Sequence, residues 1–222
     1  LCNVQEEICK RLDRGESGLL ELAQGFQLSL LYDRFYPNVT SRNVTVAQGM
    51  SDMFLPIKYA GPLVLNFRTF PIRISNNKYI AKEDGRHLTW AEIEAGVPHD
   101  VYRGNSGDWY EDQHEISWDE LTKLSGSPSD IIELTSVTKL PRRVATFSKL
   151  NVQEAIKYND TGHEIFISVN FANYVDHKMS GVRSKENITR KFYDWKEQNF
   201  GGMKIDIVGT GMKTSETIWM RN

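Results

Sequence analysis

The succession of strand and helix signals in the second half of the chain constrains its fold most. Three apolar runs predict buried strands, at residues 144–148, 164–169 and 203–208. Between the first two, Asn151 followed by Glu154 predicts a capped helix start. Residues 185–200 predict a second, amphipathic helix that ends at Gly201. Alternation of this kind is typical of an α/β fold with polar loops at the strand ends.

The first half carries weaker signals of the same kind. An amphipathic helix is expected to end at Asp13, and residues 19–22 are expected to form a buried strand that leads into a polar turn. Thr45 is expected to cap a helix that runs to about Tyr59. An alternating strand is expected at residues 63–74. Together the two halves predict one α/β sheet.

Residues 75–130 are polar and rich in Gly, Asp, Glu and Trp, and we interpret them as a surface excursion. They contain a near-repeat, residues 88–93 and 116–121, in which Thr or Ser is followed three residues later by Glu. Each copy predicts a capping box that opens a short helix. The tryptophan that follows each cap is expected to anchor its own helix rather than to stack on a base.

Composition limits the classes of function. The chain has 222 residues, 40% hydrophobic content and a formal net charge of -2. No apolar run approaches the roughly 18 residues of a membrane-spanning helix, and the net charge disfavours a nonspecific grip on duplex nucleic acid. Small polyanionic ligands remain compatible, because they need few local cations. Cys2 and Cys9 are expected to pack in a core rather than to form a disulfide, which fits a reducing compartment.

Two polar turns in the first half are candidate ligand contacts. The turn Ala23-Gln24-Gly25 offers amide donors and an acceptor where a backbone can approach a ligand closely. Residues 36–43 supply hydroxyls, amides and one cation, a set that suits a phosphate monoester. Ordinary loop chemistry is the alternative on composition alone.

Three further segments with polar or glycine-rich character lie in the second half. Residues 135–143 contain several hydroxyl side chains and three cationic ones, a set of donors that suits binding of a carboxylate or phosphate. Residues 170–176 follow one predicted strand, and residues 209–211 follow the next. Ligands of open α/β sheets sit at the carboxyl ends of the strands, so these loops are expected to line a site.

These motifs, in this order, resemble those of the adenylosuccinate synthetase family. In that family an Ala-Gln-Gly turn and a Tyr-Pro-x-x-Thr-Ser turn bind a purine nucleoside monophosphate, a Thr-and-Arg loop binds aspartate, and two late loops hold the base of a nucleoside triphosphate. The resemblance assigns monophosphate binding to Gln24, Gly25, Thr40 and Ser41. It assigns aspartate binding to Thr138, Arg142 and Arg143, and triphosphate-base binding to Asn170, Asn173, Gly209 and Gly211.

Two departures from the family pattern carry information about the substrates. Where the family reads guanine with Thr-Lys-x-Asp, this chain has Phe171 for the Lys and Asn173 for the Asp, so an amide donor stands where a second acceptor is needed. Where the family has Thr-Thr-Gly-Arg-x-Arg, Leu140 replaces an arginine that touches the ribose hydroxyl. Both departures, with residues 24–30 and 104–107, resemble the phage branch that makes 2-aminoadenine nucleotides from dGMP, aspartate and ATP.

The resemblance implies a carbon–nitrogen ligase of purine nucleotide biosynthesis. L-Aspartate would be ligated to C6 of a 6-oxopurine nucleoside monophosphate, dGMP or IMP, through a 6-phosphoryl intermediate that gives a (2-amino-deoxy)adenylosuccinate. ATP or dATP, rather than GTP, would drive the reaction with Mg²⁺. Catalysis would consist mostly of positioning and charge stabilisation.

The implied fold is the P-loop-NTPase-like adenylosuccinate synthetase fold. Residues 1–222 would be the carboxyl-terminal portion of a single domain, with an insertion near residues 76–103. The phosphate loop, the general base, the general-acid His and the Mg²⁺ ligands are expected before Leu1, so no catalytic or metal-binding residue is assigned in this chain, and the chain alone is expected to be inactive.

The resemblance also implies a cytoplasmic protein, in the host cytoplasm if phage-encoded, that does not bind membranes and is compatible with a homodimer. Two other classes of function remain open. One is a non-catalytic module that kept the monophosphate pocket. The other is an interaction domain whose tryptophan-bearing excursion contacts a partner protein. Aspartate-dependent turnover separates the enzyme from both.

Overall fold

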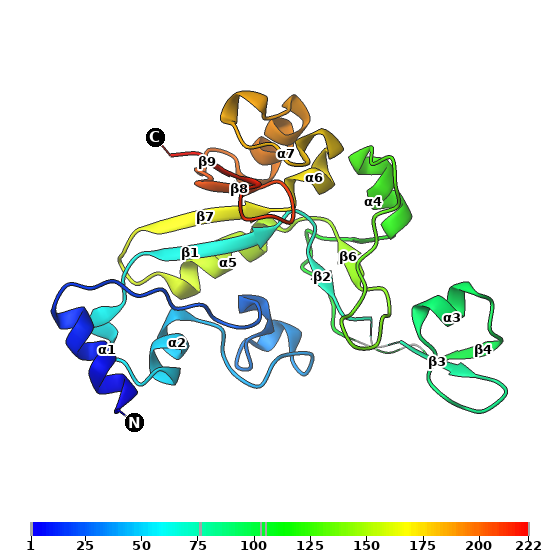
Figure 1. The fold of residues 1–222 in the computed structure, drawn as a ribbon, viewed down its shortest axis with the longest axis horizontal. Helices are drawn as coiled ribbons and strands as arrows, with labels where there is room; N and C mark the ends of the chain where they lie inside the picture. The colour runs from blue at the N-terminus through cyan, green and yellow to red at the C-terminus, as the bar shows by residue number, and fades with distance from the viewer. Residues whose placement is uncertain (1, 76, 103, 105, 222) are drawn as a thin grey trace. The chain divides into compact units, whose positions relative to one another are not determined.

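The computed structural model describes residues 2–75, 77–102, 104 and 106–221, which form a mixed α/β structure (Figure 1). They form two compact units: unit 1 comprises Leu1–Leu65 with Asn151–Phe166, and unit 2 comprises Asn66–Leu150 with Ile167–Asn222. The α/β class expected from the sequence is confirmed. The single domain stays a prediction, and Asn105 of the phage-like run 104–107 lies outside the described residues.

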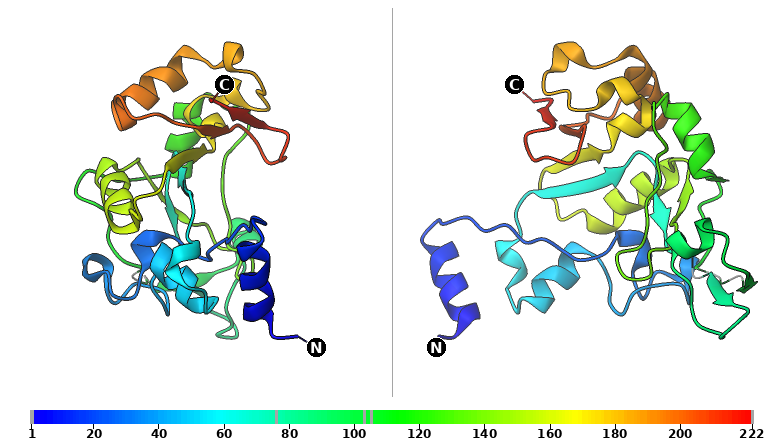
Figure 2. Two further views of the ribbon diagram at one scale, coloured as in Figure 1. Left: turned by 90° about the vertical axis from the view of Figure 1, so that its left-hand side faces the viewer. Right: turned by 45° about the vertical axis from the view of Figure 1, so that its right-hand side comes forward.

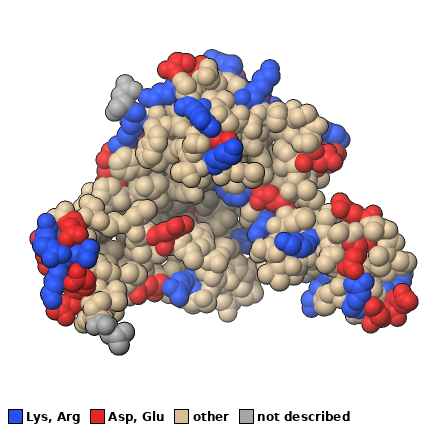
Figure 3. All heavy atoms as spheres, viewed as in Figure 1, with Lys and Arg blue, Asp and Glu red and all other residues tan. Residues whose placement is uncertain are grey.

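Unit 1 begins with helix α1 (Val4–Asp13), which ends at the predicted residue. The side chain of Asn3 caps it by accepting a hydrogen bond from Glu6 N at 3.3 Å. None of its residues is buried, and ion pairs such as Lys10–Glu6, at 2.7 Å, cover its surface. Figure 3 shows basic and acidic side chains next to one another over this helix.

The segment after α1 contains no strand, so the buried strand expected at residues 19–22 is wrong. Leu19 is 93% exposed. The side chains of Leu20 and Leu22 both point toward Gly49 of helix α2. A Cβ added at Gly49 would lie 3.2 Å from a side-chain carbon of Leu20 and 2.7 Å from one of Leu22. One face of this extended segment is thus covered, but no described strand pairs with it. Core packing is also wrong for Cys2, which is exposed and precedes α1.

Helix α2 (Val46–Asp52) starts at the predicted cap but ends earlier than expected. The hydroxyl of Thr45 accepts from the backbone N–H three residues later, at 3.3 Å. The helix ends before Tyr59 because Phe54 is left-handed, with φ 54°, and because Pro56 disfavours helical backbone at the residue before it. A separate 3₁₀ turn, η3 (Ile57–Tyr59), follows.

The larger sheet has the strand order β1-β7-β8-β9 (Figure 1). Its strands are β1 (Leu63–Arg68), β7 (Ile165–Asn170), β8 (Ile207–Gly209) and β9 (Thr217–Trp219). β7 and β8 are parallel, with Ser168 opposite Ile207, whereas β8 and β9 are antiparallel. The parallel pair brings the carboxyl ends of β7 and β8 to one edge of the sheet, where loops 170–176 and 209–211 begin.

Helix α7 (Arg190–Phe200) connects β7 to β8 along the chain and supplies part of the core of unit 2. It ends at Gly201, as predicted, where φ is 56°. Its last residue, Phe200, packs on Phe147 with ring centroids 5.0 Å apart and on Phe67 at 6.2 Å. This aromatic cluster fixes α7 against the sheet.

The strand expected at residues 63–74 is divided by a bend at Thr69 and Phe70 and by Pro71, which lacks a backbone N–H. The second piece, β2 (Ile72–Arg73), belongs to a three-stranded antiparallel sheet of order β2-β6-β5. Its other strands are β6 (Arg143–Ala145) and β5 (Glu115–Ile116).

The polar excursion holds a small antiparallel pair, β3 (Lys78–Ala81) and β4 (His99–Tyr102), with helix α3 (Trp90–Glu94) beside it (Figure 2). Both predicted caps exist. Thr89 and Glu92 form a reciprocal capping box on α3, and Ser117 caps α4 (Trp118–Ser125) by accepting from Glu120 N.

Helix α5 (Lys149–Asn159) begins two residues before the predicted Asn151. Its cap comes from a distant part of the chain: one carboxylate oxygen of Asp112 accepts from Lys149 N at 2.7 Å and from Leu150 N at 3.2 Å. The other accepts from the Ser148 hydroxyl at 2.7 Å. A cap from so far along the chain leaves no local sequence signal.

Short helical turns complete the described structure: η1 (Phe26–Leu28), η2 (Asp33–Phe35), α6 (Ala172–Val175), η4 (His177–Met179) and η5 (Lys185–Asn187). Within the described ranges, no helix has the length and apolarity needed to cross a bilayer.

Candidate functional site

The two polar turns of unit 1 are joined by backbone hydrogen bonds. Thr40 N donates to Leu28 O at 2.7 Å, and Leu30 N donates to Arg42 O at 3.1 Å. The segment that follows the first turn, residues 28–30, therefore runs beside residues 40–42 of the second turn. The structure brings together the two motifs that the sequence placed a dozen residues apart.

Of the predicted monophosphate-binding residues, Thr40 takes part in this junction through its backbone N–H. Gln24 is exposed and left-handed, with φ 73°, whereas Gly25 is extended, with φ −111°. The left-handed backbone conformation therefore belongs to the glutamine and not to the glycine. A Cβ added at Gly25 would also have no neighbour within 4 Å, so neither conformation nor space requires glycine there. In the described part of the chain, the side chains of Gln24, Thr40 and Ser41 have no hydrogen-bond partner.

The cation expected in this site is already engaged, since Arg42 forms an ion pair with Asp52. Glu154, which was expected to serve as a capping partner, instead accepts from the Tyr32 hydroxyl and pairs with Arg34 at 3.3 Å. Burial raises the pKa of Glu154. These contacts tie α5 to the segment that follows Gly25.

In unit 2, residues 133–142 form a narrow loop with a hydrogen-bonded base. Arg142 N donates to Glu133 O at 2.8 Å, and Thr135 N donates to Leu140 O at 2.9 Å. The hydroxyls of Thr135 and Thr138 hydrogen-bond each other inside the loop. Hereafter these residues are called the aspartate loop, after the role that the sequence predicts for them.

The two arginines predicted to bind aspartate, Arg142 at the end of the aspartate loop and Arg143 in β6, differ in the donors that they have free. Nε of Arg143 donates to Glu115 at 2.9 Å, its Nη1 donates to Ser106 Oγ at 2.9 Å, and its guanidinium lies 5.2 Å from the Trp109 ring centroid. Burial alone would raise the pKa of Glu115, but hydrogen bonds from Arg143 and Trp109 outweigh it and lower that pKa. Arg142 has no side-chain ion pair or hydrogen bond with any described residue. Its donors are therefore the ones available to a ligand.

The ends of β7 and β8 are in contact. Asn170 donates to Asn66 Oδ1 at 2.8 Å, and a Cβ added at Gly209 would lie 2.0 Å from Asn170 Oδ1. A Cβ added at Gly211 would lie 2.2 Å from Glu216 Oε2. Any side chain at either glycine would displace the Asn170 or Glu216 side chain, which lies directly against the glycine backbone.

Residues 170–176, hereafter the base loop, contain a buried acceptor without a partner. Oδ1 of Asn173 is buried and accepts no hydrogen bond from the described residues. The residue before α6, Phe171, is left-handed, with φ 66°, and the Arg68 guanidinium lies 3.7 Å from its ring centroid. An orphaned buried acceptor costs about 1–3 kcal/mol, so it indicates an absent donor.

The base loop and the aspartate loop meet at one side chain. Tyr174 donates its hydroxyl to Glu133 Oε1 at 3.0 Å, and Arg68 pairs with the same carboxylate. Burial, and then the charge of Glu133, raise the pKa of Tyr174. Glu133 thus joins the two loops of unit 2 in which the aspartate and triphosphate-base residues are predicted.

The residues that hold these loops were missed by the sequence reading: Asn66, Arg68, Glu115 and Glu133. Each contacts residues far away along the chain, so no local pattern marks it. The position of Asn66 and Arg68 in a predicted strand was the one available signal. Among the described residues, no group of three or more His, Cys, Asp or Glu side chains could hold a metal ion.

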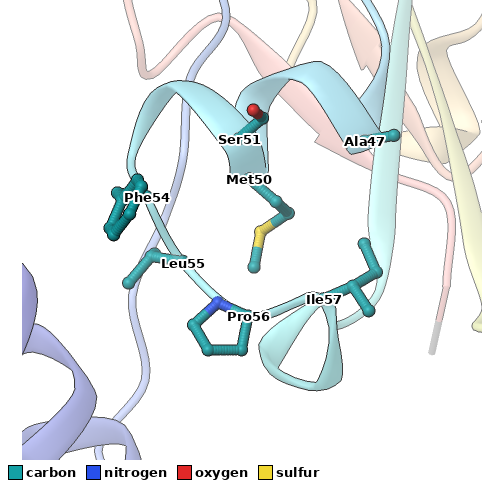
Figure 4. Close-up of a pocket in the computed structure, with 7 residues that line it drawn as sticks. All are labelled: Ala47, Met50, Ser51, Phe54, Leu55, Pro56 and Ile57. Carbon is teal, nitrogen blue, oxygen red and sulfur yellow. The ribbon is translucent and has the colours of Figure 1, made fainter.

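A hollow of about 480 Å³ in unit 1 is separate from these loops. It lies between α2 and η3 and is lined by the residues shown in Figure 4: Ala47, Met50, Ser51, Phe54, Leu55, Pro56 and Ile57. Apart from Ser51 the lining is apolar, so the hollow lacks the convergent polar groups of a nucleotide site.

Comparison with known proteins agrees with the loops. The chain is 36% identical over 163 residues to the N6-succino-2-amino-2'-deoxyadenylate synthase of Acinetobacter phage SH-Ab 15497, an alignment covering 73% of this chain and 35% of that protein. It is 35% identical over 224 residues to the adenylosuccinate synthetase of Thermococcus onnurineus, covering 100% of this chain and 54% of that protein. Over its own length, the chain belongs to the adenylosuccinate synthetase family. No protein-family model matches it.

A solved member of the family confirms the fold. The structure of the succinoaminodeoxyadenylate synthetase of cyanophage S-2L, bound to dGMP and dATP as an energy donor, matches with a TM-score of 0.60 and 29% identity. The match covers 90% of this chain and 45% of that one. The chain therefore spans about a third to a half of the length of these relatives, 35% of the Acinetobacter phage enzyme and 54% of the Thermococcus enzyme. The predicted likeness to the adenylosuccinate synthetase family, and to its phage-type members, is confirmed.

Proposed function

We propose that this chain is the substrate-binding part of a carbon–nitrogen ligase that joins L-aspartate to C6 of a 6-oxopurine nucleoside monophosphate. The observation that carries the proposal is the cluster in unit 2, where the aspartate loop and the base loop share Glu133 at the edge of the sheet. Two ligand loops in contact suit a reaction in which a triphosphate activates one substrate for attack by another.

The monophosphate is assigned to the joined turns of unit 1, with Gln24, Gly25, Thr40 and Ser41 as its contacts. Their side-chain amide and hydroxyl groups are without partners in the described structure and so are free to bind a purine edge and a phosphate. We assign dGMP rather than IMP, because the phage relatives are named for a 2-amino-2'-deoxy product and the cyanophage structure holds dGMP.

Aspartate is assigned to Thr138 and Arg142, with Arg143 as a support for the strand behind them. Arg142 can present a forked donor pair to a carboxylate, whereas the donors of Arg143 are used within the protein. Lys139 is left-handed, with φ 53°, at the position where the family pattern has Gly. That conformation supports aligning this loop with the family pattern Thr-Thr-Gly-Arg-x-Arg without a gap. The alignment places Leu140 where the family has its first arginine, so no side-chain donor is present there for a ribose 2′-hydroxyl.

The triphosphate is assigned as ATP or dATP, its base held by Asn170, Asn173, Gly209 and Gly211. Asn173 Oδ1 lacks a donor, and the 6-amino group of adenine would supply one. Guanine has an oxygen in place of this amino group, and two acceptor oxygens cannot hydrogen-bond to each other. The cyanophage relative holds dATP as its energy donor.

Within this reaction the chain's own residues bind and orient. Arg142 would hold the aspartate carboxylate, the base loop would fix the triphosphate, and the unit 1 turns would hold the monophosphate. Mg²⁺ bound with the triphosphate would neutralise its charge. The described residues offer no carboxylate cluster for it, so no Mg²⁺ ligand is assigned in this chain. From the family alone, we also propose a homodimer in the cytoplasm, that of the host if the protein is phage-encoded.

Phosphate release by the full natural protein tests the proposal. We expect aspartate-dependent release with dGMP and ATP or dATP, exceeding that with IMP and GTP. Arg142→Ala should raise the KM for aspartate at least tenfold, since a charge-assisted bond contributes about 1.5–3 kcal/mol. Arg190→Ala, which breaks an exposed ion pair on α7 at 2.8 Å, is the matched control. Release with IMP and GTP alone would refute the phage-type substrates. Binding of dGMP without any aspartate-dependent turnover would favour the non-catalytic module.

A further inference from the structure

Glu133 occupies a structural position that its sequence neighbourhood does not reveal. Its backbone carbonyl closes the base of the aspartate loop by accepting from Arg142 N at 2.8 Å. One residue further on, Leu134 and Pro141 form an isolated antiparallel bridge. The backbone of Glu133 therefore sets where the loop starts, and with it the direction in which Arg142 leaves the loop.

The side chain of the same residue holds the base loop. Its carboxylate accepts a hydrogen bond from the hydroxyl of Tyr174 at 3.0 Å, and Tyr174 follows Asn173 directly in the sequence. It also pairs with Arg68, whose guanidinium covers the Phe171 ring at 3.7 Å. Glu133 thus contacts the residues on both sides of Asn173 in the sequence. It binds Tyr174 directly, and it reaches Phe171 through Arg68.

Besides Glu133, the base loop has an independent hydrogen-bonded tether at its start. The Thr69 hydroxyl donates to Phe171 O at 2.7 Å, and Thr69 N donates to Asn170 O at 3.1 Å. These bonds fix the start of the loop but not Tyr174 at its far side. Helix α6 also packs against α4 and α7, and the Glu133 carboxylate, with 21% of its side chain exposed, is the group that joins the Tyr174 side chain to the aspartate loop.

We propose that Glu133 is a positioning residue that couples the aspartate loop to the base loop, so that occupancy of one substrate site favours the other. The inference rests on the proposed function. A triphosphate base bound at Asn173 would order the neighbouring Tyr174, whose hydroxyl binds the Glu133 carboxylate. Ordering Glu133 would in turn fix its backbone carbonyl, which accepts the hydrogen bond from Arg142 N. Thermodynamic linkage makes the effect reciprocal, so aspartate tightens triphosphate binding by the same factor.

Glu133→Gln tests the coupling in the full natural protein, because it removes the charge and keeps the shape. We expect the KM for aspartate and the KM for ATP each to rise about fivefold, the size of one net hydrogen bond, while kcat stays within about twofold. In the wild type, saturating ATP should lower the Kd for aspartate; in the variant, that change should disappear. A change confined to the KM for ATP would overturn the coupling.

Two further variants separate positioning from a general loss of stability. Tyr174→Phe removes only the hydroxyl bond, so we expect it to raise the KM for ATP and to weaken the coupling less than Glu133→Gln does. Glu92→Gln, at another glutamate that binds an arginine and a hydroxyl, should leave both KM values unchanged. A lower thermal midpoint with unaltered KM values in Glu133→Gln would show a purely structural residue. A wild-type protein without aspartate-dependent release would instead overturn the proposed function itself.

Discussion

A single buried oxygen, Oδ1 of Asn173, is the atom that we propose reads the base of the triphosphate. It has no donor among the described residues, and an amide can supply one acceptor and one donor edge to adenine. Asn173→Asp replaces the amide donor with a second acceptor, which suits the ring N–H and 2-amino groups of guanine. We expect the ratio of kcat/KM for GTP to that for ATP to rise at least tenfold, because bonds to a charged group contribute about 1.5–3 kcal/mol.

Steady-state phosphate release with each triphosphate measures this ratio. Asn3→Asp is the matched control, since it makes the same chemical change at the cap of α1, where an aspartate also caps well. An unchanged ratio in Asn173→Asp, with the fold intact, would remove Asn173 from base recognition.

Among the elements, helix α5 depends on a cap supplied from outside it. Asp112 accepts from Lys149 N at 2.7 Å, from Leu150 N at 3.2 Å and from the Ser148 hydroxyl at 2.7 Å. Asp112→Ala should lower the free energy of unfolding by about 1–2 kcal/mol, the usual cost of a lost cap. Urea unfolding monitored by circular dichroism measures it. Asp119→Ala, at an exposed pair with Lys123, should cost less than half as much. Equal losses would argue against the cap.

Helix α3 should lose stability in acid. The hydrogen bond from Arg86, and then those from Thr89, lower the pKa of Glu92 from its ordinary 4.5 to about 2. A carboxyl whose pKa is lower in the folded state stabilises that state above the unfolded pKa. The contribution of Glu92 is therefore complete above about pH 5 and is lost as the pH falls from 4.5 toward 2. A carboxyl-carbon NMR titration of Glu92 should show a midpoint far below 4.5. A midpoint near 4.5 would contradict the capping box.

The elements found from the sequence are those whose start and stop signals are local. Thr45, Thr89 and Ser117 each cap the helix that follows them, and Gly201 ends α7. The failures have non-local causes. Residues 19–22 have the apolar character of a strand, but a strand exists only with a partner. The start of α5 was misplaced because its cap is Asp112.

The candidate site follows the same division. Its loops were found because turn residues such as those around Gln24 and Thr138 carry their chemistry in the local sequence. Glu133 and Asn66 were missed because their importance lies in contacts with residue 174 and residue 170. Arg143 was predicted to bind aspartate, and the sequence could not show that Glu115 and Ser106 already use its donors.

At the scale of the whole molecule, the candidate ligands divide between the two units. The monophosphate residues lie in unit 1, whereas the aspartate loop and the base loop lie in unit 2. Each ligand should therefore protect a different set of backbone amides from hydrogen exchange. A ligand at one hundred times its Kd stabilises the bound state by about 2.7 kcal/mol, which slows exchange through local opening about a hundredfold.

Hydrogen exchange on the full natural protein, measured by mass spectrometry, distinguishes the two sets. With dGMP alone, we expect slower exchange at Leu30 and Thr40, whose N–H groups join the two turns of unit 1. With ATP and aspartate, we expect slower exchange at Arg142 and Tyr174 in unit 2, because their N–H groups close the aspartate loop and α6. Guanosine without phosphate is the control for dGMP, because it should leave Thr40 unprotected. Protection by dGMP confined to unit 2 would reverse the assignment and return the Gln24 turn to ordinary loop chemistry.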